Sequence, residues 1–424
     1  MSSLIDNVTL LQRNNISCDN SLERKNVDSL DEEEKFNWYE NPLLQPNDAS
    51  EKIATNNSSL CASLYNGLLM IVILPVILIL FILFLLLWIL PGFGLLYERY
   101  AEARDRKKYY PSIEEMQPWG CNNTLVHVVH LRATESKLPP IVYISGLGTS
   151  MYVVKSLLIK FVEYMREPVE ILSFDSPGYG ASEPPTDWNT HNAETELALL
   201  RQVIEKSALR KPFILFGASA GASLAQLYRL TYPDDVAGTI LFDPTPSNIF
   251  EPDSPMVTDF NRAFSLYSKM ACLASWGVMR PLGPFIRYFV RGEFGDIFRH
   301  LPKGHVALFM TKTMLLKTGH HFRYWHFIMD CVTKLQNDIV NPRNSPLLVV
   351  SALNWTKKRP HGGLTREEMR QWWRDNQQPF VRSSNNAGFV SRTDYTHTQC
   401  MLDMQLATNA TKAILTQIPT KTLE

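Results

Sequence analysis

The sequence predicts an α/β protein in which a mostly parallel sheet is covered by helices on both faces, preceded by one transmembrane helix. Three observations lead there. Short apolar runs alternate with helix-length segments, glycine-rich loops follow several of those runs, and residues 67–90 carry no charge. A chain of 424 residues with 45% hydrophobic residues also has enough material for a full-sized core.

The N-terminal part contains a polar tail and then the apolar segment. Residues 1–66 are rich in Asn, Ser, Asp and Glu and have no sustained helix or strand period, so we expect this tail to be mostly disordered. Residues 67–90 would reach roughly 30 Å or more as a helix, which is enough to cross a bilayer. The segment is too far from the N-terminus and too long for a signal peptide, and a core helix is rarely so uniformly apolar.

The charges beside the predicted span indicate its orientation. Residues 48–66 hold a single basic residue, whereas the stem at 91–114 holds five: Arg99, Arg104, Arg106, Lys107 and Lys108. The positive-inside rule therefore favours a single-pass membrane protein whose C-terminal part is cytosolic. An argument against this orientation is that the long tail would then have to cross the membrane without a cleavable signal.

Charge and composition exclude several classes of function. Lys plus Arg and Asp plus Glu are equal at 42 each, and no basic stripe with interleaved aromatics occurs, so we expect no nucleic-acid partner. The six cysteines are scattered without a CxxC pair. Two glycine pairs, at Gly146 and at Gly178, lack the third glycine of a dinucleotide fingerprint, and we expect no cofactor.

Seven apolar runs rich in β-branched and aromatic residues are candidate strands. We expect the first to be a half-exposed hairpin strand, because His127 and His130 interrupt it. The others should form a parallel sheet that is covered on both faces, and chemistry in such sheets gathers at the carboxyl ends of the strands. The runs are 125–131, 140–145, 169–174, 212–217, 238–243, 345–351 and 387–391.

The stretch FILFGASAGAS at 213–223 is the strongest catalytic signal. A serine nucleophile on a sharp strand-to-helix turn needs small neighbours, because the backbone around it is strained. Gly217 and Gly221 lie two positions to either side of Ser219, and the following segment reads as a helix that ends before Pro233. The N-terminus of that helix would stabilise negative charge developing beside Ser219.

The serine needs a base, and the most suitable of the ten histidines is His397. It follows the last candidate strand, on a loop that returns to the same edge of the sheet. The remaining histidines fall in strands, in polar turns or in the segment between the runs at 238–243 and 345–351. None of them has a recognised metal-ligand spacing, so we expect no metal site.

A carboxylate must orient this histidine, and Asp243 ends the run at 238–243 on the correct edge. The rival position follows the run at 345–351, but no Asp or Glu occurs from Asn344 through Arg366. Asp394 and Asp403 are near His397 in sequence, which usually directs side chains elsewhere. Asp175 also ends a candidate strand, and we interpret it as structural.

These motifs, together with SGLG at 145–148 and DSPGYGAS at 175–182, resemble the α/β-hydrolase family, in which Ser, acid and His occur in this order. The resemblance is to members whose acid follows strand six. It implies an oxyanion hole made of the backbone N–H groups of Leu147 and Ala220. Relatives usually begin the first of these loops with His-Gly, whereas this chain has Ser145-Gly146, which leaves the packing of the loop open.

The resemblance also implies a division of the chain. The hydrolase core would occupy 115–246 and 344–424, and a helical cap or lid would occupy 247–343. The cap sequence is rich in aromatic residues and Met, which suits an apolar acyl chain but is equally usual for the core of a cap.

We therefore expect a membrane-anchored serine hydrolase that cleaves an ester, with a small acyl ester or a lipid as substrate. Ser219 excludes dehalogenases and epoxide hydrolases that use an aspartate nucleophile. Two alternatives stay open: an acyltransferase on the same fold, and a binding module without catalysis. The oligomeric state is left open by the sequence.

Overall fold

A computed structural model of the chain describes residues 73–84, 86, 93–109, 116–119, 124–133, 135–282, 309, 311–339, 342–354 and 363–419. The predicted disordered tail at 1–66 lies outside these ranges, and the predicted span at 67–90 lies partly outside them. Residues 73–84 of that span are helical. Among the helices within the described ranges, none is both long enough and apolar enough to cross a bilayer.

Eight strands form one sheet, in the order β1-β2-β4-β3-β5-β6-β7-β8. Every pairing from β4 to β8 is parallel, and β2 pairs antiparallel with both β1 and β4. This confirms the expected mostly parallel sheet. The strands are β1 (Met116–Trp119), β2 (Thr124–Leu131), β3 (Ile141–Ile144), β4 (Ile171–Phe174), β5 (Phe213–Ala218), β6 (Val236–Phe242), β7 (Leu347–Ala352) and β8 (Ala387–Arg392).

The two antiparallel strands differ from expectation. β1 has the sequence MQPW and was not predicted, because a run of four residues with an internal proline has no strand periodicity. β2 was predicted to be half-exposed, yet most of it is buried. Its histidines fit there because each has an acidic partner: His127 Nδ1 lies 2.8 Å from Asp175 Oδ2, and His130 Nε2 lies 2.6 Å from Glu170 Oε1.

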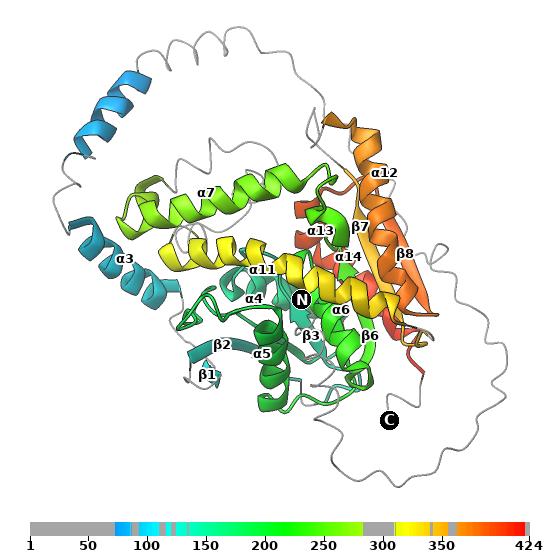
Figure 1. Cartoon of the computed structure of the whole chain (residues 1–424). Coiled ribbons are helices and arrows are strands. Elements are labelled where there is room, and N and C mark those ends of the chain that lie inside the picture. The colour runs from blue at the N-terminus through cyan, green and yellow to red at the C-terminus, as the bar shows by residue number, and fades with distance from the viewer. Residues whose placement is uncertain are drawn as a thin grey trace, which may run out of the picture.

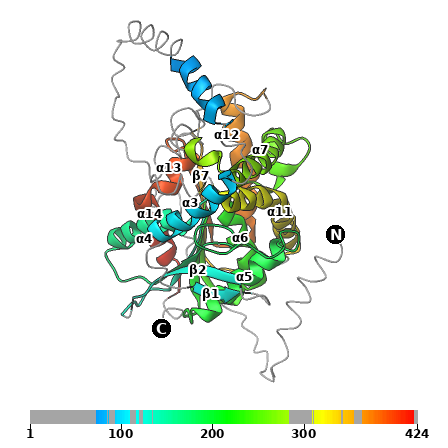
Figure 2. The ribbon, with the colours of Figure 1, turned by 90° about the vertical axis from the view of Figure 1, so that its left-hand side faces the viewer.

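Helices cover both faces of the sheet. α4 (Met151–Met165) and α14 (Met404–Leu415) lie on one side, and α5 (Ala193–Lys206) and α6 (Ala220–Thr231) lie on the other, as Figure 2 shows. Alternate residues of the buried strands point to opposite faces, so the two helical layers enclose two separate apolar cores. This arrangement explains why the strands read as continuous apolar runs.

Two long helices occur between β6 and β7, in the region predicted as a cap. α7 (Val257–Ser275) and α11 (Lys312–Asn337) pack against each other, and α11 also packs on α6 (Figure 1). The remaining described elements are α3 (Phe93–Tyr109), α12 (Arg366–Gln377), α13 (His397–Leu402) and the short 3₁₀ turns Pro233–Asp235, Ser247–Phe250 and Gln378–Ser383.

α3 is held to the rest of the molecule by a buried charge cluster. The guanidinium of Arg280 donates to Glu98 Oε2 at 2.6 Å and also to Asp105. All three side chains are at most 6% exposed. Burial raises the pKa of Glu98 to about 7, although the hydrogen bond and charge of Arg280 act in the opposite direction.

Candidate active site

Ser219 lies at the turn between β5 and α6 in a strained backbone conformation. Its φ is 54° and its ψ is −122°, a region that residues with a side chain rarely adopt. Its backbone N–H donates to the carbonyl of Phe242 on β6 at 2.8 Å. The turn depends on Gly221, since a Cβ there would lie 2.3 Å from the carbonyl oxygen of Ile144. Only glycine permits this close approach of backbones.

The structure brings Ser219, His397 and Asp243 together, although they are far apart in sequence. His397 Nε2 lies 3.0 Å from Ser219 Oγ, and His397 Nδ1 lies 2.6 Å from Asp243 Oδ2. The three side chains come from the ends of β5 and β6 and from the first residue of α13. A carboxylate on Nδ1 fixes the proton at that nitrogen, so that the lone pair of Nε2 can accept the serine proton.

Asp243 is 1% exposed and has the left-handed φ of 40°. While Oδ2 faces His397, Oδ1 accepts three hydrogen bonds. The donors are the backbone N–H of Ala352 at 3.1 Å, Nε1 of Trp373 at 2.7 Å and Nε2 of Gln377 at 2.9 Å. This number of donors offsets the cost of burying a carboxylate.

The competing carboxylates have other partners. Asp394 forms a two-pronged ion pair with Arg392, with N–O distances of 2.9 and 2.7 Å, and these hydrogen bonds lower the pKa of Asp394. Asp403 accepts from the Tyr395 hydroxyl and caps α14. Asp175 accepts from the backbone N–H of Met151 at 2.7 Å and pairs with His127. None of these three side chains has a described hydrogen bond with His397.

The backbone N–H groups of Leu147 and Ala220 donate no hydrogen bond to any described residue. The loop that carries Leu147 approaches Ser219 closely, because a Cβ on Gly146 would lie 3.0 Å from Ser219 Cβ. Gly148, which follows Leu147, has a φ of 71° and donates its N–H to the Tyr179 hydroxyl at 3.1 Å. The Ser145-Gly146 sequence is thus compatible with a loop that reaches the nucleophile.

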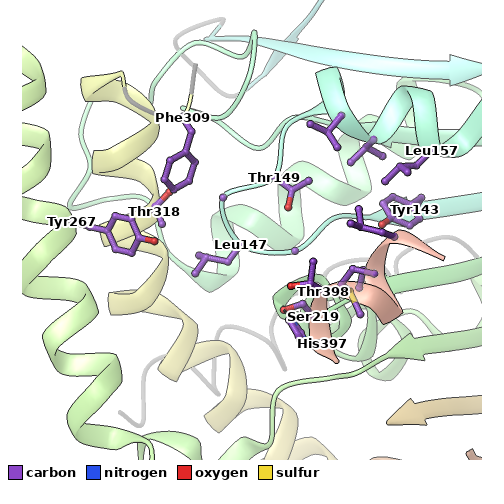
Figure 3. A pocket seen from close by; sticks show the side chains of 17 residues that line it. Tyr143, Leu147, Thr149, Leu157, Ser219, Tyr267, Phe309, Thr318, His397 and Thr398 are labelled. Carbon is purple, nitrogen blue, oxygen red and sulfur yellow. Dashed lines mark hydrogen bonds between the residues drawn. The ribbon is translucent and has the colours of Figure 1, made fainter. Parts of the chain in front are cut away.

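A pocket of about 120 Å³ opens beside Ser219 and His397. In Figure 3, Ser219 and His397 lie beneath the loop of Leu147 and Thr149, with Tyr267 and Phe309 on one side and Tyr143 and Leu157 on the other. No Asp, Glu, Lys or Arg lines it among the described residues. The described lining is Tyr143, Gly146, Leu147, Gly148, Thr149, Val153, Val154, Leu157, Ala218, Ser219, Tyr267, Phe309, Thr318, His397, Thr398, Met401 and Leu402.

A buried polar cluster between α5 and α11 was missed by the sequence analysis. Lys317, which is completely buried, donates to Glu196 and lies 2.7 Å from His191 Nε2. Burial acts to raise the pKa of Glu196, but the charges of Lys317 and His191 and the hydrogen bond with His191 together outweigh it and hold that pKa well below its usual value. Lys317 stands in an otherwise amphipathic helical segment, so no local signal marked it as buried.

Within the described ranges, no group of three or more His, Cys, Asp or Glu side chains could hold a metal ion. The histidines of α11 instead make ring contacts. His320 stacks on Trp188 with ring centroids 4.9 Å apart, and His321 stacks on Tyr179 at 6.2 Å. Burial lowers the pKa of His321 to about 3, and the charge of Lys317 adds to the effect.

Comparison with known proteins places this geometry in a family. The model of a family described as "Alpha/beta hydrolase family" matches residues 141–395, a range that includes Ser219 and Asp243 and ends two residues before His397. The chain belongs to the alpha/beta hydrolase family. Membership agrees with the strand order, the elbow at Ser219 and the position of the site at the carboxyl edge of the sheet.

Solved structures share the fold at low identity. The epoxide hydrolase CorEH matches with a TM-score of 0.52 and 14% identity, over 72% of this chain and 99% of that one. A mutant of DBJA matches with a TM-score of 0.50 and 12% identity, over 72% and 98%. A carboxylesterase from the thaumarchaeon Nitrososphaera gargenis matches with a TM-score of 0.47 and 11% identity, over 68% and 92%. No curated protein matches the sequence.

Proposed function

We propose that this alpha/beta hydrolase is a serine hydrolase that cleaves a carboxylic ester through an acyl-enzyme on Ser219. The observation that carries the proposal is the hydrogen-bond chain from Asp243 through His397 to Ser219 Oγ, at 2.6 and 3.0 Å, which ends at the uncharged pocket. A serine, a histidine and a buried carboxylate in this order supply a nucleophile, a base and a group that orients the base.

The first half of the reaction forms the acyl-enzyme. Ser219 Oγ attacks the ester carbonyl carbon while His397 Nε2 takes the hydroxyl proton, and the carbonyl oxygen gains the negative charge. The backbone N–H groups of Leu147 and Ala220 would hold this oxyanion, since both lie beside Ser219 without another described acceptor. The carbon–oxygen bond to the alcohol then breaks, and His397 returns the proton to the leaving alkoxide.

The second half regenerates the enzyme. Water loses a proton to His397 Nε2 and attacks the acyl carbon, and Ser219 leaves as its alkoxide and recovers the proton. In both halves Asp243 carries the negative charge that stabilises the imidazolium. Because Asp243 is buried and His397 is partly exposed, the charge pair is formed at the floor of the pocket and not in bulk water.

The pocket favours an acyl group without charge. Its apolar lining includes Val153, Val154 and Leu157 of α4. Met401 and Phe309 add further apolar side chains, and the described lining has no ionic group that could pair with a charged substrate. An acyltransferase would use the same acyl-enzyme with an alcohol in place of water. Product analysis in the presence of a competing alcohol separates the two reactions.

We also propose that residues 67–90 anchor the enzyme in a membrane, with the catalytic part on the cytosolic side. The apolar sequence supports the anchor, and the described side chains of this segment are largely exposed in the isolated chain, for example Leu78 at 56%. Resistance of the full-length protein to carbonate extraction tests the anchor. Digestion of the C-terminal part by protease outside sealed microsomes tests its side.

Fluorophosphonate labelling tests the catalytic proposal. We expect wild type and Ser156→Ala to be labelled equally, because Ser156 is exposed on α4 and bonded only to its own helix. Ser219→Ala should not be labelled and should not hydrolyse p-nitrophenyl esters. An unlabelled wild-type protein, or equal labelling of Ser219→Ala, would reject a serine hydrolase and favour the non-catalytic binding module.

A further inference from the structure

Two side chains of α12 donate hydrogen bonds to Asp243, the proposed acid. α12 comes after β7, where the rival acid position of the sequence analysis was found to hold no carboxylate. Two of its side chains reach instead to Asp243 Oδ1, Trp373 at 2.7 Å and Gln377 at 2.9 Å. They are four residues apart and therefore project from one face of the helix.

The two donors are buried, and packing or a further hydrogen bond holds each of them in place. Trp373 is 5% exposed and belongs to a separate apolar cluster with Ile249, Met256, Leu353 and Met369. Gln377 is completely buried, and its Nε2 also donates to the carbonyl of Pro244 at 2.6 Å, so a single amide spans Asp243 and the next residue. Side chains locked by packing hold a neighbouring group in one orientation.

The start of α12 is equally well defined. Thr365 Oγ1 accepts from the N–H of Glu368 at 3.2 Å, and Glu368 Oε2 accepts from the N–H of Thr365 at 2.6 Å. This reciprocal capping box fixes the first turn of the helix, and the buried side chain of Met369 fixes its inner face. Position and rotation of α12 are therefore both determined, which sets where its donors point.

The demand for such donors comes from Asp243 itself. Its backbone is in the left-handed region, and its carboxylate could rotate about the Cβ–Cγ bond if only His397 bound it. Three hydrogen bonds on Oδ1 and one on Oδ2 define the plane of the carboxylate and direct Oδ2 toward His397 Nδ1. Both side-chain donors are neutral, so neither adds a cation that would compete with the His397 imidazolium for the carboxylate.

We infer that Trp373 and Gln377 are positioning residues of the reaction, which hold the Asp243 carboxylate aimed at His397. This inference rests on the proposed function, because it assigns them a part in the same acyl transfer. Neither residue touches the pocket, so they act on the rate through Asp243 and not on substrate binding. A role in packing alone is the competing explanation, since Trp373 also fills the apolar cluster.

The test uses Trp373→Phe, which keeps an aromatic ring in the cluster, and Gln377→Met, which keeps the length of the side chain. Trp372→Phe is the matched control, because no hydrogen bond joins Trp372 to Asp243. Each full-length variant is first titrated with a fluorophosphonate, so that kcat is expressed per reactive site. The downfield proton signal of the His397 Nδ1–H group is then followed by NMR, alongside kcat and KM for a p-nitrophenyl ester.

We expect Trp373→Phe and Gln377→Met each to lower kcat per titrated site by about 10- to 100-fold, the size of one hydrogen bond to a charged group, with KM within about two-fold. The Nδ1–H signal should shift in both, while Trp372→Phe matches wild type. Unchanged kcat per site with fewer titratable sites would reduce Trp373 and Gln377 to packing and overturn the inference. A wild type that is not labelled at all would instead reject the proposed function.

Discussion

The strained backbone of Ser219 leads to a prediction about stability. We compare Ser219→Gly with Ser219→Ala, because both remove the hydroxyl and its hydrogen bond to His397 but differ in their tolerance of a φ of 54°. A non-glycine residue in such a region costs about 1–3 kcal/mol. Glycine loses more backbone entropy on folding, which lowers the stability of Ser219→Gly by about 0.5–1 kcal/mol relative to Ser219→Ala. Ser219→Gly should therefore be more stable than Ser219→Ala by about 0.5–2 kcal/mol.

Thermal unfolding of the full-length variants measures this difference. In a domain of this size each kcal/mol moves Tm by about 2–4 °C, so the two values should be separable. Both variants should lack ester hydrolysis because the attacking hydroxyl is gone. A higher stability of Ser219→Gly would show that the backbone conformation at the nucleophile costs stability. A Ser219→Gly protein that melts at or below the temperature of Ser219→Ala would refute the reasoning.

Three further predictions concern other parts of the molecule. Asp243→Asn should lower kcat by about three to four orders of magnitude with little change in melting temperature, because the amide no longer fixes the His397 tautomer. Near-wild-type activity of Asp243→Asn, or loss of activity in Asp394→Asn, would show that Asp243 is not the acid of the triad. Gly221→Ala should destabilise the protein by about 1–3 kcal/mol, because the new Cβ would lie 2.3 Å from the Ile144 carbonyl oxygen. Gly319→Ala, whose Cβ would have its nearest neighbour at 3.6 Å, should instead stabilise α11 by up to about 1 kcal/mol. Urea unfolding measures both variants, and equal effects would contradict this prediction. Glu98 has a pKa of about 7 in the folded protein against 4.5 when unfolded, so the folded protein binds the proton more tightly and loses stability as pH rises from 4.5 through 7. The free energy of unfolding should therefore fall between pH 5 and pH 8 by about 2 kcal/mol more in wild type than in Glu98→Gln. Parallel pH profiles of the two proteins would contradict this prediction.

Much of the fold could be predicted from the sequence because it depends on local patterns. A strand buried on both faces must be apolar along its length, and the runs ending at Phe174, Ala218 and Phe242 show this directly. β1 was not predicted, because it is a strand through its pairing with β2 and not through its composition. The burial of β2 depends on Asp175 and Glu170, which are more than 35 residues away, so no local pattern revealed it.

The site could be predicted as far as its motifs extend. Ser219 is marked by the glycines that its turn requires, and Asp243 and His397 by their places after strands. The donors on α12 have no such signal, because Trp373 and Gln377 become meaningful only once α12 is folded against Asp243. The same holds for Lys317, whose burial is set by Glu196 and His191 on other elements.

The central claim is that acyl transfer proceeds through Ser219, and trapping the intermediate tests it most directly. Full-length protein is mixed with a p-nitrophenyl ester and quenched in acid within the first turnover, and its peptides are then mapped by mass spectrometry. We predict an acyl group on the peptide that contains Ser219, formed together with one equivalent of nitrophenol. Ester hydrolysis without this adduct, or an adduct on a different residue that also survives in Ser219→Ala, would contradict the account.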